Sequence, residues 1–418
     1  MKDYILTTPN DIEQNLINLK QLVFEVTDAC NLRCKYCGYA DLYEGYDKRE
    51  NTYFPFKRAK LIIDYLYNNY WKKKTGKGYT RTINIGFYGG EPLLNMPFIK
   101  EVIAYIENLP YIGITFKFGM TTNAMLLDRY MDYLVEKDFF ILISLDGNEE
   151  GQSYRVDASG NNSFHRVIKN VRKLSKSYPA YFKDKVMFNS VLHNRNSVES
   201  TYTFIKEEFD KVTSFSALNT TDVRRDKIEE FNRMYKNVAQ DLNCSSKCGI
   251  IEQEMFINAP QTARLLDYLR TYSGNFYQSY VNLLMDKNNL KQPLTATCTP
   301  FMRKLFVTVN GKILQCEKIN HDFAVGLVTN DEVTLDLKQA AELHNRYTST
   351  YIKECKTCAI RKNCKRCVYM FGNPLNDKKC YSYMTSDELQ AEKETSLRYL
   401  EERNYLYDKI LSEVIIRE

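Results

Sequence analysis

The apolar run Leu22–Val26 is followed at once by three closely spaced cysteines, Cys30, Cys34 and Cys37. Three thiolates are one fewer than a structural zinc site or a closed iron–sulfur cluster normally uses. In a cube of four irons, three thiolates hold three irons and leave the fourth iron open to another ligand. The spacing therefore predicts an iron–sulfur cluster with one open position. A zinc site completed by a distant residue is the alternative.

The other cysteines lie later in the chain. Seven form an array, Cys298, Cys316, Cys355, Cys358, Cys364, Cys367 and Cys380, and two more, Cys244 and Cys248, form the motif CSSKC. Cysteines in a reducing compartment rarely form disulfides, so metal binding or redox catalysis is the better interpretation of all 12. Only 4 histidines accompany them, and thiolate without imidazole favours iron–sulfur clusters. A zinc ribbon is the alternative for the array.

The composition is that of an ordinary folded protein. The 418 residues are 44% hydrophobic and 26% charged, and this length suits roughly two to three domains. The net charge of +6 is spread out and the run Lys72–Lys74 is short, so no nucleic-acid partner is predicted. The N-terminal MKDYILTTPNDIEQ lacks the apolar core of a signal peptide, and no apolar run reaches the ~18 residues of a membrane span. A cytoplasmic location without membrane contact is predicted.

Six apolar runs with strand character alternate with helical patterns in the first half of the chain. They are Leu22–Thr27, Thr82–Tyr88, Ile114–Thr121, Phe139–Leu145, Lys185–Leu192 and Val212–Leu218. Such alternation implies parallel strands joined by helical crossovers. Six strands are fewer than a closed eight-unit barrel needs. The predicted fold is therefore α/β, an open, partial (β/α)6 barrel.

Polar or glycine-rich groups follow four of these strands in turn. Cys30 follows the first strand, Gly89–Glu91 the second and Thr122–Asn123 the third. Ser144 and Asp146 end the fourth. Active sites on such scaffolds gather at the carboxyl ends of the strands, so these groups are predicted to meet at one mouth.

After the sixth strand, helices are predicted over Lys227–Leu242 and over Gln261–Asn288, with a break near Gly274. Short strands and turns are predicted from Cys298. A capping box at Thr385 predicts a tail helix packed on the body by its apolar face, Leu397, Leu400, Tyr407, Leu411 and Val414. The predicted divisions are an N-terminal segment (1–20), the barrel (21–220), a helical bridge (221–297), a cysteine-rich domain (298–385) and a C-terminal helix (386–418).

Three motifs lie at the expected strand ends: CNLRCKYC at residues 30–37, YGGEP at 88–92 and SLDG at 144–147. In this order they resemble the radical SAM enzymes. The resemblance implies that the open iron of a [4Fe–4S] cluster binds S-adenosylmethionine. It also implies that the reduced cluster splits S-adenosylmethionine into methionine and a 5′-deoxyadenosyl radical.

The resemblance also implies roles for single residues. It makes Cys30, Cys34 and Cys37 the ligands of the reactive cluster. Contacts with S-adenosylmethionine are implied for Gly89, Gly90 and Glu91 (methionyl ammonium), Arg155 (methionyl carboxylate), Ser144 (ribose), Tyr36 (adenine) and Asn123. Ala124 follows Asn123 where the family has glycine. Each of these residues alone has a simpler explanation as a turn or a surface charge.

The second cysteine array resembles the SPASM domain, an extension with two auxiliary [4Fe–4S] clusters. The resemblance implies an outer cluster on Cys355, Cys358, Cys364 and Cys380 and an inner cluster on Cys298, Cys316 and Cys367. Two residues separate Cys364 from Cys367 where three are usual. The inner set is one ligand short. Either its fourth iron is open and can bind a substrate thiolate, or Cys244 and Cys248 complete it.

SPASM enzymes mostly modify peptides, and the stretch RKLFVTVNGKILQCEK resembles maturases that cross-link ribosomally made peptides. The predicted function is abstraction of a hydrogen from a precursor-peptide residue, followed by a thioether bond between that carbon and a peptide cysteine. The predicted cofactors are three [4Fe–4S] clusters and S-adenosylmethionine. Glu317, beside Cys316, is a candidate base, and a solvated carboxylate is the alternative.

Three other functions stay open: a maturase that forms carbon–carbon or carbon–oxygen cross-links, a sulfatase-maturing enzyme that makes formylglycine, and a non-catalytic iron–sulfur electron carrier. The stretch TPFMRK lacks a cysteine found in sulfatase-maturing enzymes, which argues against the second. The predicted partners are the precursor peptide and an external electron donor such as flavodoxin or ferredoxin. About twenty residues precede the first strand, too few for a leader-binding winged helix. Leader binding is therefore assigned to a separate protein, to the tyrosine-rich barrel and bridge, or to the tail helix.

Overall fold

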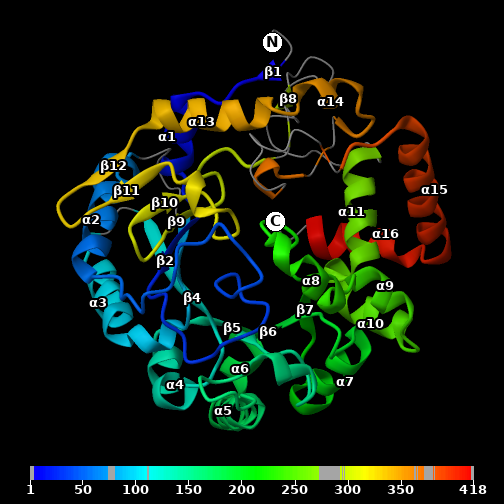
Figure 1. The fold of residues 1–418 in the computed structure, drawn as a ribbon, viewed down its shortest axis with the longest axis horizontal. Coiled ribbons are helices and arrows are strands. Elements are labelled where there is room, and N and C mark those ends of the chain that lie inside the picture. Colours follow the sequence, from blue (N-terminus) through cyan, green and yellow to red (C-terminus); the bar gives the residue numbers. More distant parts are fainter. Residues whose placement is uncertain are drawn as a thin grey trace. The chain divides into compact units, whose positions relative to one another are not determined.

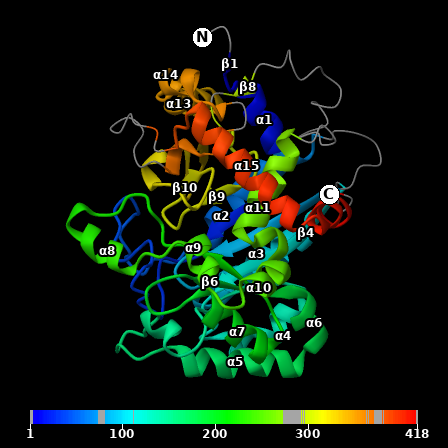
Figure 2. The same ribbon diagram turned by 90° about the vertical axis from the view of Figure 1, so that its right-hand side faces the viewer.

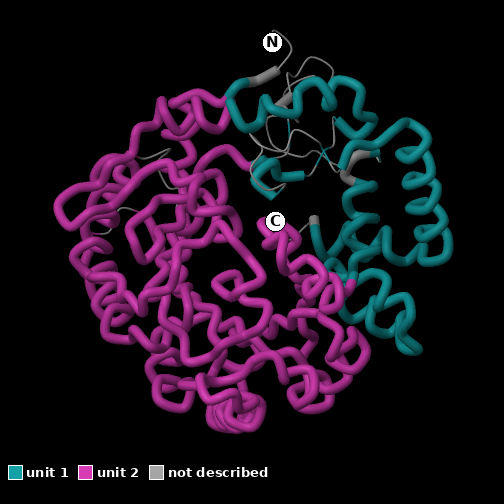
Figure 3. The backbone as a smooth tube through the Cα atoms, viewed as in Figure 1, with its two compact units in different colours: residues 1–6, 237–297, 346–418 teal, residues 7–236, 298–345 magenta. Residues whose placement is uncertain are grey.

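The computed structural model describes residues 4–73, 81–110, 113–272, 292–293, 295, 297–361, 364, 366–370, 380 and 382–415. The chain divides into two compact units (Figure 3). Unit 1 comprises residues 1–6, 237–297 and 346–418, and unit 2 comprises residues 7–236 and 298–345. Residues 298–345, predicted as the first part of the cysteine-rich domain, thus belong to the same unit as the barrel.

Six parallel strands form the centre of unit 2 (Figure 1). They are β2 (Gln21–Glu25), β3 (Arg81–Tyr88), β4 (Ile114–Thr122), β5 (Phe140–Ser144), β6 (Val186–Val191) and β7 (Thr213–Ser216). They pair in chain order, and β7 lies at an edge of the sheet, so the barrel is open. The predicted α/β fold with six parallel strands is confirmed, and each strand end differs from its predicted position by at most two residues.

Helices cover one face of these strands. They are α2 (Phe56–Leu66), α3 (Met96–Glu107), α4 (Leu127–Glu136), α5 (Phe164–Ser177), α6 (Pro179–Lys185) and α7 (Val198–Phe209). Figure 2 shows α4, α5 and α6 together below the strands. Phe24, Ile85 and Ile143 of the strands share one buried core with Ile63 of α2 and Val102 of α3. Removal of these apolar side chains from water holds the two layers together.

The opposite face of the strands lines the inside of the barrel. Here Val23, Gly86, Gly119 and Phe140 stand side by side in register on β2, β3, β4 and β5. Phe140 is 41% exposed although it is a large apolar side chain. The two neighbouring glycines contribute no side chain to this row. The interior is therefore not filled at this level.

The sheet continues beyond β2 with four short strands. β9 (Leu305–Val307) runs parallel to β2, and β10 (Lys312–Leu314), β11 (Gly326–Val328) and β12 (Val333–Leu335) follow antiparallel. Gly311, in the turn between β9 and β10, has φ +88°, and a Cβ there would lie 2.1 Å from the carbonyl oxygen of Val328. Glycine is required at this turn by both its conformation and its close contact.

The remaining elements complete the two units. In unit 2, α1 (Pro9–Ile17) precedes β2, and α8 (Ile228–Met234) follows β7. In unit 1, β1 (Tyr4–Ile5) pairs with β8 (Gln292–Pro293), and the helices are α9 (Val238–Asn243), α10 (Cys248–Met255), α11 (Pro260–Tyr272), α14 (Ile352–Thr357), α15 (Ser386–Glu402) and α16 (Tyr405–Ile410). Helix α13 (Leu337–Ser349) runs from unit 2 into unit 1.

The helix predicted over Lys227–Leu242 is interrupted. It consists of α8 and α9, because Tyr235 has an extended backbone (ψ 133°) and pairs with His193. Asn237 then starts α9 by accepting two backbone N–H groups with its side chain. The break predicted near Gly274 lies outside the described residues.

The tail begins with the predicted capping box, because Thr385 and Glu388 exchange side-chain and backbone hydrogen bonds. The tail is two helices rather than one, since Arg403 leaves the helical conformation (φ −137°). Four of the predicted apolar residues pack on a buried cluster shared with α11: Leu400, Tyr407, Leu411 and Val414. The prediction was wrong for Leu397, which is 43% exposed.

Candidate functional site

The loop after β2 carries the first three cysteines and is anchored at its base by the end of β3. The N–H of Gly90 donates to the carbonyl oxygen of Thr27 at 2.8 Å, and the next N–H donates to that of Ala29 at 2.9 Å. Gly89 has φ +130°, and a Cβ on Gly90 would lie 2.0 Å from the carbonyl oxygen of Ala29. The two glycines are therefore needed for this close backbone approach.

The three thiols of the loop are close enough to influence one another. Burial raises the pKa of Cys30 to about 11, and the negative charge of Cys37 raises it as well. Burial likewise raises the pKa of Cys34 to about 12, with contributions from both other cysteines. The pKa of Cys37 is also raised by burial, although Arg49 opposes this. A bound positive group is needed to hold these thiols as thiolates at neutral pH.

Several N–H groups point at these sulfurs. The Sγ of Cys30 lies 3.4 Å from the backbone nitrogen of Leu32 and 3.7 Å from Nδ2 of Asn123. The Sγ of Cys37 lies 3.3 Å from Nη2 of Arg49. The Nε of Arg49 is buried without a hydrogen-bond partner among the described residues. N–H donors to sulfur are a regular feature of iron–sulfur sites. The buried Nε of Arg49, which has no partner among the described residues, could donate to a sulfur of a bound cluster.

The residues of the loop therefore fit a [4Fe–4S] cluster. In the described ranges, no three His, Cys, Asp or Glu side chains are placed to hold one metal ion. In a cube of four irons, by contrast, each thiolate binds a different iron. Ligation by Cys30, Cys34 and Cys37 stays a prediction.

Glu91 is a buried carboxylate that joins the ends of β3 and β4. Its Oε1 accepts the hydroxyl of Thr122 at 2.6 Å and the N–H of Leu93 at 3.1 Å, and its Oε2 accepts the N–H of Asn123 at 2.8 Å. Burial raises the pKa of Glu91 to about 7, against the effect of these bonds. The side chain of Asn123 also donates to Asn31 of the cysteine loop at 2.8 Å. The two strand ends and the loop thus meet at one edge of the sheet.

Ala124, which stands where the family has glycine, has a left-handed backbone with φ +59°. Its N–H donates to the Thr122 hydroxyl at 3.0 Å. A left-handed conformation costs an L-residue roughly 1–2 kcal/mol. The usual glycine of this motif is thereby explained, and alanine keeps the same turn here.

Asp146, just after β5, is a fully buried carboxylate that gathers two predicted site residues. Nε and Nη2 of Arg155 donate to its two oxygens at 2.9 Å and 3.0 Å, and the hydroxyl of Tyr36 also donates to it. Burial raises the pKa of Asp146, but Arg155 and the other donors lower it more, to about 2. The ring of His193 stacks on Tyr36 at 5.6 Å. Contacts of Arg155 and Tyr36 with S-adenosylmethionine stay predictions.

Ser144 ends β5 directly opposite Asn189 of β6 and is half-buried. It lies at the carboxyl end of its strand, as the loop of Cys30 and the Asn123 turn do on theirs. The predicted convergence at the carboxyl ends thus agrees with the strand topology. The ribose contact predicted for Ser144 stays a prediction.

The four predicted ligands of the outer cluster lie in unit 1 and influence one another electrostatically, and their ligation of a cluster stays a prediction. Burial raises the pKa of Cys355 to about 12, and the negative charges of Cys364, Cys380 and Cys358 raise it further. Burial raises the pKa of Cys380, and the negative charges of Cys364, Glu354 and Cys358 raise it further. The backbone N–H of Cys380 donates to Glu354 at 2.7 Å, beside Cys355 on α14.

The inner set is divided between the units. Cys298 and Cys316 belong to unit 2, whereas Cys367 belongs to unit 1. Burial raises the pKa of Cys316 to about 11, and the neighbouring carboxylate of Glu317 raises it as well. Cys244 is exposed and Cys248 half-buried, both in unit 1. Neither unit alone contains the predicted inner ligand set, which stays a prediction.

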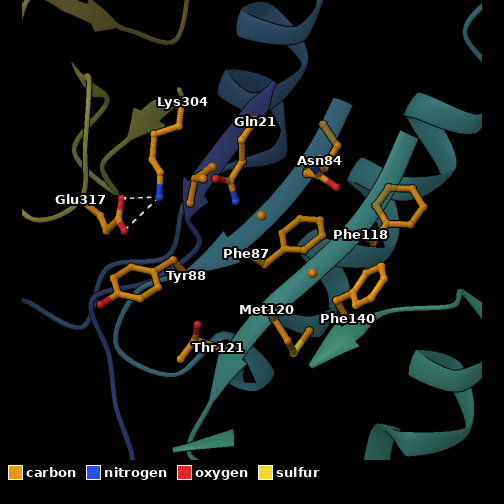
Figure 4. Close-up of a pocket in the computed structure, with 14 residues that line it drawn as sticks. Gln21, Asn84, Phe87, Tyr88, Phe118, Met120, Thr121, Phe140, Lys304 and Glu317 are labelled. Carbon is orange, nitrogen blue, oxygen red and sulfur yellow. Dashed lines mark hydrogen bonds and ion pairs between the residues drawn. The ribbon is translucent and has the colours of Figure 1, made fainter. Parts of the chain in front are cut away.

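Glu317, the candidate base, forms an ion pair with Lys304 (Figure 4). Nζ of Lys304 lies 3.0 Å from Oε1 and 2.9 Å from Oε2. Burial raises the pKa of Glu317, but the lysine lowers it more, and the net pKa lies below the usual value. A carboxylate with a lowered pKa is a weaker base. The ion pair therefore weakens the case for proton abstraction by Glu317.

A cavity of about 280 Å³ opens on the inner face of the barrel, lined by β2, β3, β4, β5 and the Lys304–Glu317 pair (Figure 4). Gly86 and Gly119 lie in its lining, as does Tyr88 at the end of β3. Burial raises the pKa of Tyr88, and the negative charges of Glu317 and Cys37 raise it further. The carbonyl oxygen of Tyr88 also accepts the N–H of Val26 at 2.9 Å, so the end of β3 contacts both the cavity and the start of the cysteine loop.

Sequence reasoning missed three residues of this site: Arg49, His193 and Lys304. Arg49 lies 12 residues after its sulfur partner Cys37, and Lys304 lies 13 residues before Glu317. Arg49 and His193 belong to no motif, and Lys304 lies in the stretch RKLFVTVNGKILQCEK without a role of its own assigned from the sequence. Only the folded chain brings them to the site.

One protein-family model matches part of this chain. Residues 24–206 match the family model described as the Radical SAM superfamily. The match begins within β2 and ends within α7, so it includes the first three cysteines, Glu91, Asp146 and Arg155. No helix in the described part of the chain is both long and apolar enough to cross a membrane.

The chain is 22% identical to a cysteine-type anaerobic sulfatase-maturating enzyme of Clostridium novyi (strain NT) over 369 residues. That alignment covers 84% of this chain and 88% of the relative. Several other curated relatives align with the chain over about half of their own length or less.

Two solved structures show a similar fold. Native anSMEcpe with bound AdoMet superposes with a TM-score of 0.62 at 20% identity, covering 93% of this chain and 98% of the other. Streptococcus suis SuiB bound to precursor peptide SuiA superposes with a TM-score of 0.54 at 18% identity, covering 89% of this chain and 77% of the other. At these identities the likeness concerns the fold alone.

Proposed function

Because residues 24–206 form a radical SAM domain, we propose that this radical SAM enzyme is a maturase of ribosomally made precursor peptides. It abstracts a hydrogen from a peptide residue and joins that carbon to the sulfur of a peptide cysteine. The observation that carries the proposal is a barrel cavity of about 280 Å³ that reaches Tyr88 at the end of β3, the strand end that anchors the cysteine loop. Such a cavity suits one or two residues of a peptide rather than a large folded partner.

A [4Fe–4S] cluster with S-adenosylmethionine, when bound at the loop, supplies the 5′-deoxyadenosyl radical. The chain's own residues then orient and protect the reaction. Glu91 and Asn123 hold the strand ends against the loop, and Asp146 fixes Arg155 and Tyr36 in place. Buried, mutually paired side chains are rigid, which favours a defined geometry at the mouth. The cavity keeps the peptide residue out of water.

Two auxiliary clusters complete the proposed cofactor set. The mutual electrostatic influence of Cys355, Cys358, Cys364 and Cys380 supports the outer cluster. Cys298, Cys316 and Cys367 would hold the inner cluster, and an open iron there would bind the peptide thiolate. Abstraction of the hydrogen atom removes one electron from the peptide, formation of the carbon–sulfur bond releases a second, and the auxiliary clusters would accept that second electron.

A sulfatase-maturing activity is the second candidate. The similarity to the cysteine-type enzyme of Clostridium novyi over most of both chains supports it about as much as the array supports thioether formation. This activity oxidises a protein cysteine or serine to formylglycine and uses the same kinds of cofactor. Carbon–carbon or carbon–oxygen cross-linking is compatible with the same site, because neither bond needs a thiolate on the inner cluster.

Two further partners belong to the proposal. An external one-electron donor of the flavodoxin or ferredoxin type reduces the reactive cluster. The SuiB structure contains a bound precursor peptide, which supports peptide binding by this fold. The leader of the peptide is bound by a separate protein, by the barrel and bridge surface, or by the tail helices.

The test is anaerobic incubation of the enzyme, a reductant and S-adenosylmethionine with two peptides. One is a short cysteine-containing peptide encoded beside the gene, and the other is a sulfatase segment with its target cysteine. Loss of two hydrogens and of one alkylatable thiol from the first peptide supports the thioether. Loss of two hydrogens with every thiol free supports another cross-link. Appearance of an aldehyde on the second peptide alone would replace the proposal with sulfatase maturation.

A further inference from the structure

Arg49 comes from the segment that follows the three cysteines, and its guanidinium reaches back to the last of them. Its Nη2 lies 3.3 Å from the Sγ of Cys37, and its central carbon lies 4.5 Å from the ring centroid of Tyr39. Its Nε is buried and has no hydrogen-bond partner among the described residues. The guanidinium is thus stacked on a ring and held beside a sulfur, with one buried donor left over.

Arg49 is one of three arginines whose charges lower the pKa of Cys37, together with Arg155 and Arg33. Arg155 is paired at two points with the carboxylate of Asp146, which offsets its charge. One buried acid near Arg49 is Glu25, and burial raises the pKa of Glu25 to about 8. Glu25 is therefore mostly neutral at pH 7 and compensates little of the arginine charge. Arg49 is half-buried, which weakens the screening of its charge by water and salt.

We propose that Arg49 is a positioning residue that sets the reduction potential of the cluster on the cysteine loop. Its guanidinium donates to the Cys37 sulfur and holds a positive charge beside the cluster. Reduction adds one electron from the external donor, and hydrogen bonds to sulfur and nearby positive charge both favour the more negative, reduced state. Arg49 therefore raises the potential and makes reduction easier. This inference rests on the proposed function, because it needs a cluster on the loop.

The direct test is a redox titration of the full-length holoenzyme followed by electron paramagnetic resonance. The reactive cluster is recognised by the signal that changes when S-adenosylmethionine is added. Arg49→Gln keeps an N–H donor and removes the charge. We expect its reduced-to-oxidised ratio at a fixed potential to fall at least about tenfold, which is a shift of about 59 mV to more negative potential. Iron content per chain is measured alongside.

Two variants define the comparison. Arg49→Lys keeps a positive charge but loses the planar group that spans Tyr39 and Cys37, so we expect a smaller shift in the same direction. Lys48→Gln removes an exposed positive charge one residue away, which water and salt screen, so we expect no shift. If Arg49→Gln fails to hold iron, the potential of Arg49→Lys is the test. An unchanged potential in Arg49→Lys would overturn the inference.

The outcomes separate this inference from the proposed function. A shift in Arg49→Gln with none in Lys48→Gln supports both. An unchanged potential in Arg49→Gln, with a cluster that still responds to S-adenosylmethionine, overturns the role of Arg49 and leaves the enzyme a radical SAM maturase. A wild-type protein with no signal that responds to S-adenosylmethionine overturns the proposed function itself.

Discussion

The guanidinium of Arg155 and the carboxylate of Asp146 form a two-point ion pair inside unit 2, with N–O distances of 2.9 Å and 3.0 Å. The two side chains are 8% and 0% exposed. Asp146 also accepts the N–H of Val191 on β6, so the pair ties the end of β5 to the next strand. A buried ion pair contributes little net stability, but removal of one partner leaves an unpaired buried charge.

Arg155→Met should therefore lower the free energy of unfolding by about 3–5 kcal/mol at pH 7. The matched control is Arg172→Met, which breaks a similar two-point pair with Glu208 at the surface. That loss should be about 1 kcal/mol or less, because water already solvates both charges. Urea unfolding followed by circular dichroism measures both variants. Equal losses would contradict the importance of burial at Asp146.

The buried acid Glu25 makes the free energy of unfolding fall as pH rises, whereas a salt-bridged acid makes it rise. It is 1% exposed, and burial raises its pKa from 4.5 to about 8, partly offset by the N–H of Val309. Between these two values the unfolded chain has released the proton and the folded chain has kept it. Stability therefore falls as pH rises from about 4.5 to about 8, by about 1.4 kcal/mol for each pH unit.

Glu25→Gln replaces this acid with a neutral group of the same shape that can still pair with Val309 and Tyr39. The variant should have a downward slope between pH 5 and 8 that is shallower by about 1.4 kcal/mol for each pH unit, with the contribution of Glu91 remaining, and should exceed the wild type in stability at pH 8. Urea unfolding at three pH values within this range measures the slope. A variant with the wild-type slope would show that another group causes it.

The six parallel strands, and the gathering of polar groups at their carboxyl ends, could be predicted because the sequence patterns that indicate them are local. Each strand is a short apolar run bounded by polar residues, and parallel strands place their carboxyl ends at one edge. Thr385 and Glu388 predicted the start of α15 correctly, because a capping box needs only four consecutive residues.

The rest depends on contacts between distant parts of the chain. The pairing of β9 with β2 joins residues 305–307 to residues 22–24, and nothing in either segment specifies the other. Asp146 was noted only as a strand end, yet its partners come from three separate elements. Leu397 fits the helical period of the tail but faces solvent, and the buried side chains of α15 are those of Ser396 and Tyr399 instead.

The cysteine assignments predict different losses in two variants. Cys34→Ala should remove about four irons per chain and abolish S-adenosylmethionine cleavage, since its cube loses one of three ligands. Cys358→Ala, in unit 1, should also lower the iron content but keep cleavage of S-adenosylmethionine in the absence of peptide. Iron analysis and chromatography of 5′-deoxyadenosine measure the two effects. Cleavage retained by Cys34→Ala would refute the ligand assignment.

Gly119 lies in the cavity lining between Gly86 and Phe140, and a Cβ there would lie 3.3 Å from the carbonyl oxygen of Phe140. Gly119→Ala and Gly119→Val should progressively fill the cavity that we assign to the peptide residue. A pocket that loses this space typically loses about 1–3 kcal/mol of substrate discrimination, so kcat/KM for the peptide should fall at least about tenfold in Gly119→Val.

Cleavage of S-adenosylmethionine without peptide separates this effect from damage to the fold, and it should stay at the wild-type rate in both variants. Thr115→Val is the matched control, because Thr115 is an exposed residue of the same strand outside the cavity. It should change neither rate. If both glycine variants process the peptide as the wild type does, the peptide residue binds elsewhere. If peptide-free cleavage also falls, the side chain has disturbed the mouth, and the cavity assignment loses its support from this test.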